Sequence, residues 1–222
     1  MQDHGSAYSD KGEGYFSNTR QEMLPFIPTD VHLILDIGCG DGSFGALLKR
    51  TRDVEVTGVE AFPDAAERAR EVLDHVLGSN VEVDNLELPQ GYFDCIIYND
   101  VLEHLRDPWN TVSRLSCFLR PGGYAVSSIP NVRYFDVFKD LLVSKEWVYQ
   151  DEGVLDRTHL RFFTEKSIPR MFDETGYEVL QLQGIHGRRF PWKFALFNLI
   201  SGGRFDDVAY QRFACVARLR AP

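Results

Sequence analysis

Residues 34–45 read ILDIGCGDGSFG: an apolar run of strand length passes into three glycines within five residues, and a segment that fits a helix follows. Glycine has no Cβ, so such a loop can turn sharply and a ligand can lie against its main chain. One glycine would be enough for a tight turn between a strand and a helix. Three glycines behind the strand-end residue Asp36 therefore predict a ligand site rather than a turn alone.

The acidic residues of this loop indicate the charge of the ligand. Its spacing is G-x-G-x-G, whereas the dinucleotide fingerprint is G-x-G-x-x-G, with a pyrophosphate at the helix N-terminus. Asp36 and Asp41 would repel a pyrophosphate, but they suit a ligand that carries an ammonium or sulfonium group. This favours S-adenosylmethionine over a nicotinamide dinucleotide.

Outward from the loop, apolar strand-like runs alternate with amphipathic helical segments. This alternation predicts an α/β fold, a largely parallel sheet with helices on both faces. Ligands of such sheets bind beyond the carboxyl ends of the strands. The expected strands are 32–37, 54–60, 81–84, 92–98, 124–130, 177–185 and 209–219, and the expected helices are 17–24 (stopped by Pro25), 43–51 (with Ser43 as N-cap), 63–77, 107–119 and 165–176, the last ending at Gly176.

Two more strand ends carry candidate ligand groups. Glu60 ends the second expected strand, 20 residues beyond Gly40, where an acidic side chain can accept both hydroxyls of an adenosine ribose. Asp84 ends the third expected strand and Asn85 follows it, so the pair could bind the amino edge of an adenine. Asp84 could equally cap a turn.

The composition limits the classes of protein to which the chain can belong. The chain has 222 residues and a net charge of −9, which fits one soluble domain and argues against a nucleic-acid partner. No apolar run is long enough for a membrane span. The cysteines have no metal or disulfide spacing and are expected to be reduced, mostly buried thiols of a cytoplasmic protein. They are Cys39, Cys95, Cys117 and Cys215.

Four segments together resemble the motifs of the class I S-adenosylmethionine-dependent methyltransferases, over roughly residues 15–180. They are ILDIGCGDG, VTGVEAFP (56–63), YFDCIIYNDVLEHLRDP (92–108) and FLRPGGYAVSSIPN (118–131). The resemblance implies a Rossmann-like sheet of seven strands with the last one antiparallel. It also implies S-adenosylmethionine as cofactor and S-adenosylhomocysteine as product.

The resemblance also implies roles for individual residues. An N-terminal lid or helix (1–30) would precede the methyltransferase domain (31–222), which would carry an acceptor-side insertion at 131–164. The implied cofactor contacts are Tyr15 and Arg20 from the lid; Asp36, Gly38, Cys39 and Gly40 at the methionine part; Glu60 at the ribose, with Ala61 and Phe62 beside the adenine; Asp84 and Asn85 at the adenine edge; and Asn99 at the methionine moiety.

One subgroup is more similar than the rest of the family. SIPNVRYFDVFKDLL (128–142) and EGVLDRTHLRFFTEKSIPRMFDETGY (152–177) resemble stand-alone bacterial methyltransferases associated with glycan and polysaccharide biosynthesis. This implies O-methylation of a sugar or glycan intermediate. The alternatives are a quinone, lipid or natural-product acceptor, and an inactive cofactor-binding scaffold. A nucleic-acid acceptor is disfavoured, because YNDVLEHL lacks the Asn-Pro-Pro-aromatic motif that holds a flipped base.

A hydroxyl acceptor needs a general base, for which histidine is the usual choice. His104 follows the fourth expected strand, and His159 lies in the insertion that would roof the acceptor site. Either could be the base, and either could instead make a structural hydrogen bond. The spacing of Asp100, Glu103, His104 and Asp107 also admits a magnesium site, but it equally suits helix capping, so no metal is expected.

The C-terminal segment 184–203 is basic and aromatic against an acidic average. It could be an acceptor lid, a dimer contact or a peripheral membrane contact. The favoured interpretation is an ordinary helix that docks its apolar face. The oligomeric state stays open.

Overall fold

The computed structural model describes residues 19–190 and 192–221 of the chain. Within these residues one sheet of seven strands has the order β3-β2-β1-β4-β5-β7-β6. β7 runs antiparallel to β5 and β6, and the other neighbouring pairs are parallel. The predicted sheet with an antiparallel last strand is therefore confirmed. The strands are β1 (Leu33–Ile37), β2 (Glu55–Glu60), β3 (His75–Gly78), β4 (Phe93–Asn99), β5 (Leu119–Pro130), β6 (Tyr177–Gly187) and β7 (Tyr210–Leu219).

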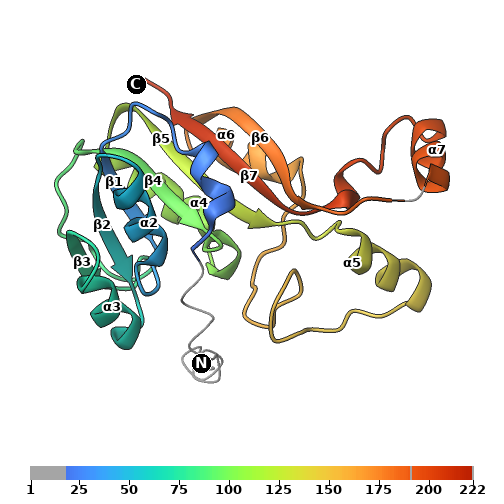
Figure 1. Ribbon diagram of the computed structural model, residues 1–222, viewed down its shortest axis with the longest axis horizontal. Helices are drawn as coiled ribbons and strands as arrows, with labels where there is room; N and C mark the ends of the chain where they lie inside the picture. The colour runs from blue at the N-terminus through green and yellow to red at the C-terminus, as the bar shows by residue number, and fades with distance from the viewer. Residues whose placement is uncertain (1–18, 191, 222) are drawn as a thin grey trace.

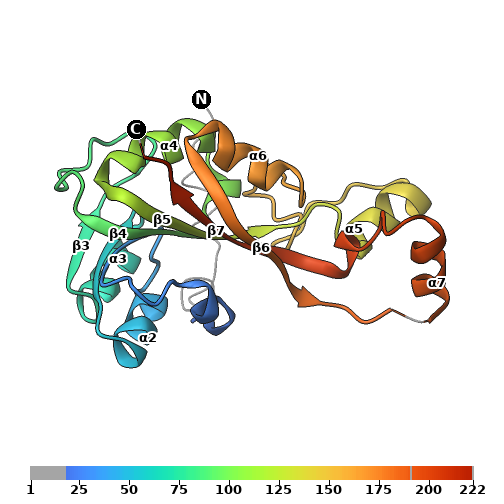
Figure 2. The same cartoon turned by 90° about the horizontal axis from the view of Figure 1, so that it is seen from above.

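Helices cover both faces of this sheet, as Figures 1 and 2 show: α2, α3 and η2 lie on one face, and α4 and α6 on the other. This cover explains why the central strands β1 and β4 are apolar and buried almost throughout. No helix among the described residues is both long and apolar enough to cross a membrane. The helices are η2 (Gln21–Phe26), α2 (Ser43–Thr51), α3 (Pro63–Arg70), η3 (Leu102–His104), α4 (Pro108–Leu115), η4 (Ser116–Phe118), α5 (Phe135–Lys139), η5 (Asp140–Ser144), α6 (Ser167–Glu174), α7 (Trp192–Ile200) and η6 (Asp207–Ala209).

The residues expected to cap α2 and to stop the first helix do not act as predicted. α2 has the predicted bounds, but its N-cap is Gly42 in the left-handed region (φ 81°) rather than Ser43. Pro25 lies inside the 3-10 helix η2 instead of stopping it. Gly176 does follow α6 with a φ of 90°, as a glycine that ends a helix should.

The third strand lies in a different segment from the one predicted. The expected helix 63–77 ends at Arg70, and residues 75–78 form β3 against β2 instead. Main-chain pairing with the sheet thus overrides the helical periodicity of Val72, Leu73 and Val76. The expected strand 81–84 is a turn, in which the backbone N–H groups of Val83 and Asp84 donate to the carbonyl of Asn80.

The first part of the insertion, which carries α5 and η5, and the segment that carries α7 together form an arm beyond the ends of β6 and β7, on the right of both views (Figures 1 and 2). α5 and α7 meet in this arm through the rings of Phe135 and Phe194. The prediction of an ordinarily docked helix is wrong for α7, because large apolar side chains on it are exposed. They are Trp192, Leu196, Leu199 and Ile200.

Candidate functional site

A cavity of about 1330 Å³ lies at the carboxyl ends of the parallel strands. The strand order reverses at β1, which has β2 on one side and β4 on the other, and such a reversal opens a crevice for ligands. Its walls come from the loops after β1, β2, β3 and β4 and from residues 150–160 of the insertion. One cavity therefore joins the glycine loop to the segment that carries His159.

The glycine loop forms one end of the cavity through its backbone conformation. Gly38, Gly40 and Gly42 have φ values of 65°, 57° and 81°, the left-handed region that favours glycine. A Cβ on Gly38 would lie 2.7 Å from Cγ2 of Val101. Both the backbone conformation and the lack of space therefore favour glycine at this position. The N–H of Gly38 donates to the carbonyl of Val59 at 2.8 Å, which holds the loop against β2.

Glu60 ends β2, as predicted, and its carboxylate faces the loop. Oε2 accepts the N–H of Gly40 at 2.8 Å and Oε1 accepts the N–H of Phe62 at 3.0 Å. The side chain is 5% exposed, and burial raises the pKa of its carboxyl although these N–H groups act against the rise. Each carboxylate oxygen has a second lone-pair site, so the group can accept further hydrogen bonds from a ligand.

Asp36 is the second buried carboxylate of this end of the cavity. Burial, and then the neighbouring charge of Glu60, raises its pKa to about 7. Two carboxylates desolvated side by side repel each other, and a cation placed between them would relieve the repulsion. The arrangement suits a positively charged ligand, which agrees with the charge inferred from the sequence.

Beyond β4 the chain makes a sharp turn at Asp100, which has a φ of 52°. The Asp100 carboxylate forms ion pairs with Arg20 and, at 3.3 Å, with Arg212, and it accepts the hydroxyl of Ser128 at 3.1 Å. Arg20 therefore reaches the cavity wall and is held there by Asp100. The side-chain amide of Asn99 also lines the cavity, and both of its polar atoms are buried without a hydrogen-bond partner among the described residues.

Glu103, His104 and His159 form a cluster in the wall of the same cavity. One potential ligand atom from each residue lies within 4.8 Å of the other two. The rings of His104 and His159 meet edge to face with centroids 4.7 Å apart. Glu103 is 1% exposed, neither of its carboxylate oxygens accepts a hydrogen bond from a described residue, and burial raises the pKa of its carboxyl to about 7.

The insertion is fastened to η3 at this cluster. The backbone N–H groups of Leu160 and Arg161 both donate to the carbonyl of Glu103, at 2.8 and 2.9 Å. Thr158 adds a side-chain contact, because its hydroxyl lies 3.2 Å from Nδ1 of His104 and donates to Asp156 at 2.7 Å. These bonds bring His159 to His104, although the two residues lie far apart in the sequence.

Most of the site residues named from the sequence line this one cavity. Asp84 and Asn85 do not, because residues 81–84 are a turn: the Asp84 carboxylate accepts the N–H of Asn80 and so caps that turn. Tyr15 lies outside the described residues. Those that line the cavity are Arg20, Asp36, Gly38, Cys39, Gly40, Glu60, Ala61, Phe62, Asn99, His104 and His159.

Sequence reasoning missed several residues of the wall. Ser79 and Asn80 follow the true third strand and lie where Asp84 and Asn85 were expected. Recognising HVLG (75–78) as a strand would have found them. Arg212 comes from β7, and no local motif marks it.

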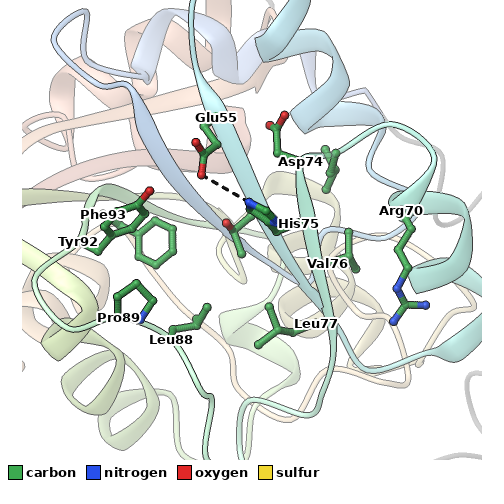
Figure 3. A pocket seen from close by; sticks show the side chains of 12 residues that line it. Glu55, Arg70, Asp74, His75, Val76, Leu77, Leu88, Pro89, Tyr92 and Phe93 are labelled. Carbon is green, nitrogen blue, oxygen red and sulfur yellow. Dashed lines mark ion pairs between the residues drawn. The ribbon is translucent and has the colours of Figure 1, made fainter.

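A second pocket, of about 600 Å³, lies at the outer edge of the sheet beside β3. Figure 3 shows its lining, including the pair of His75 and Glu55, whose Nε2 and Oε1 atoms are 3.8 Å apart. His75, expected on a helix, is thus the first residue of β3. No candidate residue of the glycine loop or of the His104 cluster lines this pocket.

Comparison with known proteins identifies the family to which the chain belongs. A profile described as a methyltransferase domain matches residues 12–182. A ubiquinone biosynthesis O-methyltransferase of Burkholderia pseudomallei is 27% identical over 188 residues, which cover 79% of this chain and 78% of that protein. The 27-O-demethylrifamycin SV methyltransferase of Amycolatopsis mediterranei is 33% identical over 107 residues, 46% of this chain and 39% of that one.

Solved structures share the fold. A SAM-dependent methyltransferase from Archaeoglobus fulgidus superposes with a TM-score of 0.65 at 16% identity, covering 93% of this chain and 94% of that one. One from Thermotoga maritima superposes with a TM-score of 0.68 at 18% identity, covering 99% and 100%. At these identities the likeness concerns the fold alone.

Proposed function

Because this chain belongs to the methyltransferase-domain family and is an S-adenosylmethionine-dependent methyltransferase, we propose that it O-methylates a polyhydroxylated small molecule such as a sugar or glycan intermediate. The observation that carries this acceptor class is the set of hydrogen-bonding side chains that line the cavity outside the glycine loop. A polyol would require such partners. They include Arg106, Gln150, Glu152, Arg157, Thr158 and Gln211.

The cofactor half of the proposal rests on the buried carboxylates. Glu60 would accept the ribose hydroxyls at the oxygens that already hold Gly40 and Phe62. Asp36 would lie near the charged methionine portion. The amide of Asn99, which has no hydrogen-bond partner within residues 19–190 and 192–221, would bind the polar end of that portion. Ser79 and Asn80 take the place first given to Asp84 and Asn85, beside the adenine.

Methyl transfer is an in-line displacement. The acceptor oxygen attacks the methyl carbon, the carbon–sulfur electron pair stays on sulfur to give S-adenosylhomocysteine, and the hydroxyl proton is lost. The protein's task is to align the two reactants and exclude water. In the proposal His104 or His159 accepts the hydroxyl proton, since both line the cavity that the glycine loop also lines.

A quinol or another phenolic acceptor is the second candidate. It is favoured by the ubiquinone O-methyltransferases among the relatives. The exposed apolar side chains of α7 would also suit contact with a lipid-soluble acceptor at a membrane surface.

The cysteines support the proposal that the protein acts in the reducing cytoplasm. All four are free thiols, and three of them are buried.

The acceptor class is tested by assaying S-adenosylhomocysteine release with a panel of nucleotide sugars, free glycans, catechols and quinols. We expect turnover with a sugar hydroxyl and a product whose new methyl group is on oxygen. Mass spectrometry of the product identifies the methylated atom. Turnover confined to catechols or quinols would replace the sugar with the second candidate, and methylation on nitrogen or carbon would contradict both.

Cofactor binding is also expected to release protons near neutral pH. The pKa of Asp36 lies at about 7, so at about pH 6.5 this carboxyl is largely protonated, and a sulfonium ligand would favour its ionised form. The affinity for S-adenosylmethionine should therefore rise between about pH 6 and pH 8. Calorimetry in two buffers of different ionisation enthalpy measures the protons released.

The Asp36→Asn variant provides the control for this linkage. Its amide cannot titrate, so the number of protons released on cofactor binding should fall. If the wild type and the Asp36→Asn variant release the same number of protons, Asp36 is not coupled to the cofactor.

A further inference from the structure

The insertion places two oxygen atoms of one residue beside the ring of His104. Nδ1 of His104 lies 3.2 Å from the hydroxyl oxygen of Thr158 and 3.3 Å from its carbonyl oxygen. Thr158 follows His104 by 54 residues, so this contact exists only when the insertion lies against η3. The ring of His104 is therefore held by a segment that no local motif connects to it.

The hydroxyl of Thr158 can only accept a hydrogen bond from His104. Its single proton is donated to Oδ1 of Asp156 at 2.7 Å, a distance typical of a bond from a hydroxyl to a carboxylate. The carbonyl oxygen of Thr158 has no proton to give. Both oxygens therefore require the proton of the neutral His104 ring on Nδ1, and the lone pair of that ring is on Nε2.

Asp156 and Thr158 are set in a buried turn. The N–H of Thr158 also donates to Oδ1 of Asp156, at 2.8 Å. Asp156 is 2% exposed and Thr158 is 7% exposed, so water competes little for these hydrogen bonds. The turn alone would need only the bond from the N–H group, whereas the hydroxyl bond also decides which way the Thr158 proton points.

His159 is held differently. Its Nδ1 lies 3.0 Å from the carbonyl of Val154, which places the lone pair of its neutral ring on Nε2. That nitrogen lies 4.0 Å from Oε1 of Glu103, which is itself 1% exposed. His159 is buried, whereas His104 is half-buried, and both line the cavity. An acceptor in the cavity can therefore reach the ring of His104 more readily.

We propose that His104 is the general base and that Thr158 and Asp156 are positioning residues that keep its proton on Nδ1, an inference that rests on the proposed O-methylation. The acceptor hydroxyl gives its proton to Nε2 of His104 while its oxygen bonds to the methyl carbon and the carbon–sulfur electron pair stays on sulfur. The imidazolium that forms donates from Nδ1 to Thr158, whose hydroxyl is polarised by Asp156. It then returns the proton to solvent.

Thr158→Val tests the positioning role in the full chain, with whichever acceptor of the nucleotide sugar, glycan, catechol and quinol panel gives turnover. We expect kcat to fall about 10–100-fold, because the lost hydrogen bond is strongest when the ring is charged. The KM values for the acceptor and for S-adenosylmethionine should change little. Thr158→Ser keeps the hydroxyl and should restore most of kcat, whereas His104→Ala should lower kcat by about 100-fold or more.

Thr175→Val is the matched control for the loss of a buried hydroxyl. The hydroxyl of Thr175 bonds to the carbonyls of Met171 and Phe172 at 2.9 and 3.1 Å, and the residue does not line the cavity. Thermal unfolding should show a loss of stability in this variant, with kcat unchanged. A wild-type kcat in Thr158→Val, or a kcat in Thr158→Ser as low as in Thr158→Val, would overturn the positioning role.

The tautomer of His104 can be measured without any acceptor. Nitrogen-15 NMR of the histidine rings distinguishes the two tautomers, and the His104 signals are those lost in His104→Ala. We expect the Nδ1–H form in the wild type. In Asp156→Ala the Thr158 hydroxyl can turn and donate to Nδ1, so the share of the Nε2–H form should rise. No rise in a folded Asp156→Ala variant would remove the role of Asp156.

This measurement separates the inference from the proposed function. A wild-type His104 ring in the Nε2–H form would overturn the inference, even in a chain that methylates a hydroxyl. The Nδ1–H form in a chain that methylates no hydroxyl of the panel would overturn the proposed function, and the role of His104 as base with it.

Discussion

Glu60→Ala is expected to weaken S-adenosylmethionine binding by about 100-fold. Two ribose hydroxyls that donate to a carboxylate contribute about 1.5–3 kcal/mol each, and losing them costs about 3 kcal/mol or more in affinity. The variant also frees the N–H groups of Gly40 and Phe62, so the glycine loop loses its tie to the end of β2. Isothermal calorimetry on the full chain measures the affinity.

Two further variants separate ligand contact from loop support. Glu60→Gln keeps one oxygen as acceptor and should lose less than the alanine variant. Glu55→Ala removes a partly exposed carboxylate from the opposite end of the same strand and should bind as the wild type does. Unchanged affinity in Glu60→Ala would remove the ribose role.

Gly38→Ala is expected to impair both cofactor binding and folding stability. An L residue at a φ of 65° costs about 1–2 kcal/mol, and the new Cβ would lie 2.7 Å from Val101. Together these effects should lower the free energy of unfolding by about 2–4 kcal/mol. The methyl group would also point toward the turn after β4, so we expect binding to fall at least about 10-fold.

Gly91→Ala is the matched control for this loss. Gly91 has nearly the same φ, 62°, but a Cβ there would meet nothing within 4 Å, and the residue does not line the cavity. In Gly91→Ala the free energy of unfolding should fall by about 1 kcal/mol, because only the backbone conformation is unfavourable. The affinity for S-adenosylmethionine should not change. Equal behaviour of the two variants in denaturant unfolding and in calorimetry would show that the space beside Gly38 is unimportant.

Local sequence predicted much of the fold because strand-length apolar runs and glycine turns are local signals. The loop at 38–42, the strand end at Glu60 and the antiparallel last strand are all as expected. The third strand was misplaced, since residues 75–78 continue a helical pattern and become a strand only by pairing with β2. The stabilisation from this pairing depends on residues distant in the sequence, so a short segment considered alone does not indicate it.

The residues of the site were also predictable only where a local motif marks them. The cofactor end comes from short motifs after β1 and β2, and most of its residues were named from the sequence, whereas Ser79 and Asn80 were not. The acceptor end depends on contacts between distant segments: His159 meets Glu103 only because the insertion hydrogen-bonds to η3, and Arg212 reaches Asp100 from the last strand. The apolar exposure of α7 was likewise unpredictable, because it depends on where the arm lies.

A crystal structure of the full chain with S-adenosylhomocysteine tests the central claim most directly. The account predicts the nucleoside in the large cavity, with both ribose hydroxyls within hydrogen-bond distance of Glu60. It also predicts that the sulfur lies between the glycine loop and the cluster of Glu103, His104 and His159. A ligand in the edge pocket beside β3, or a ribose without contact to Glu60, would contradict it.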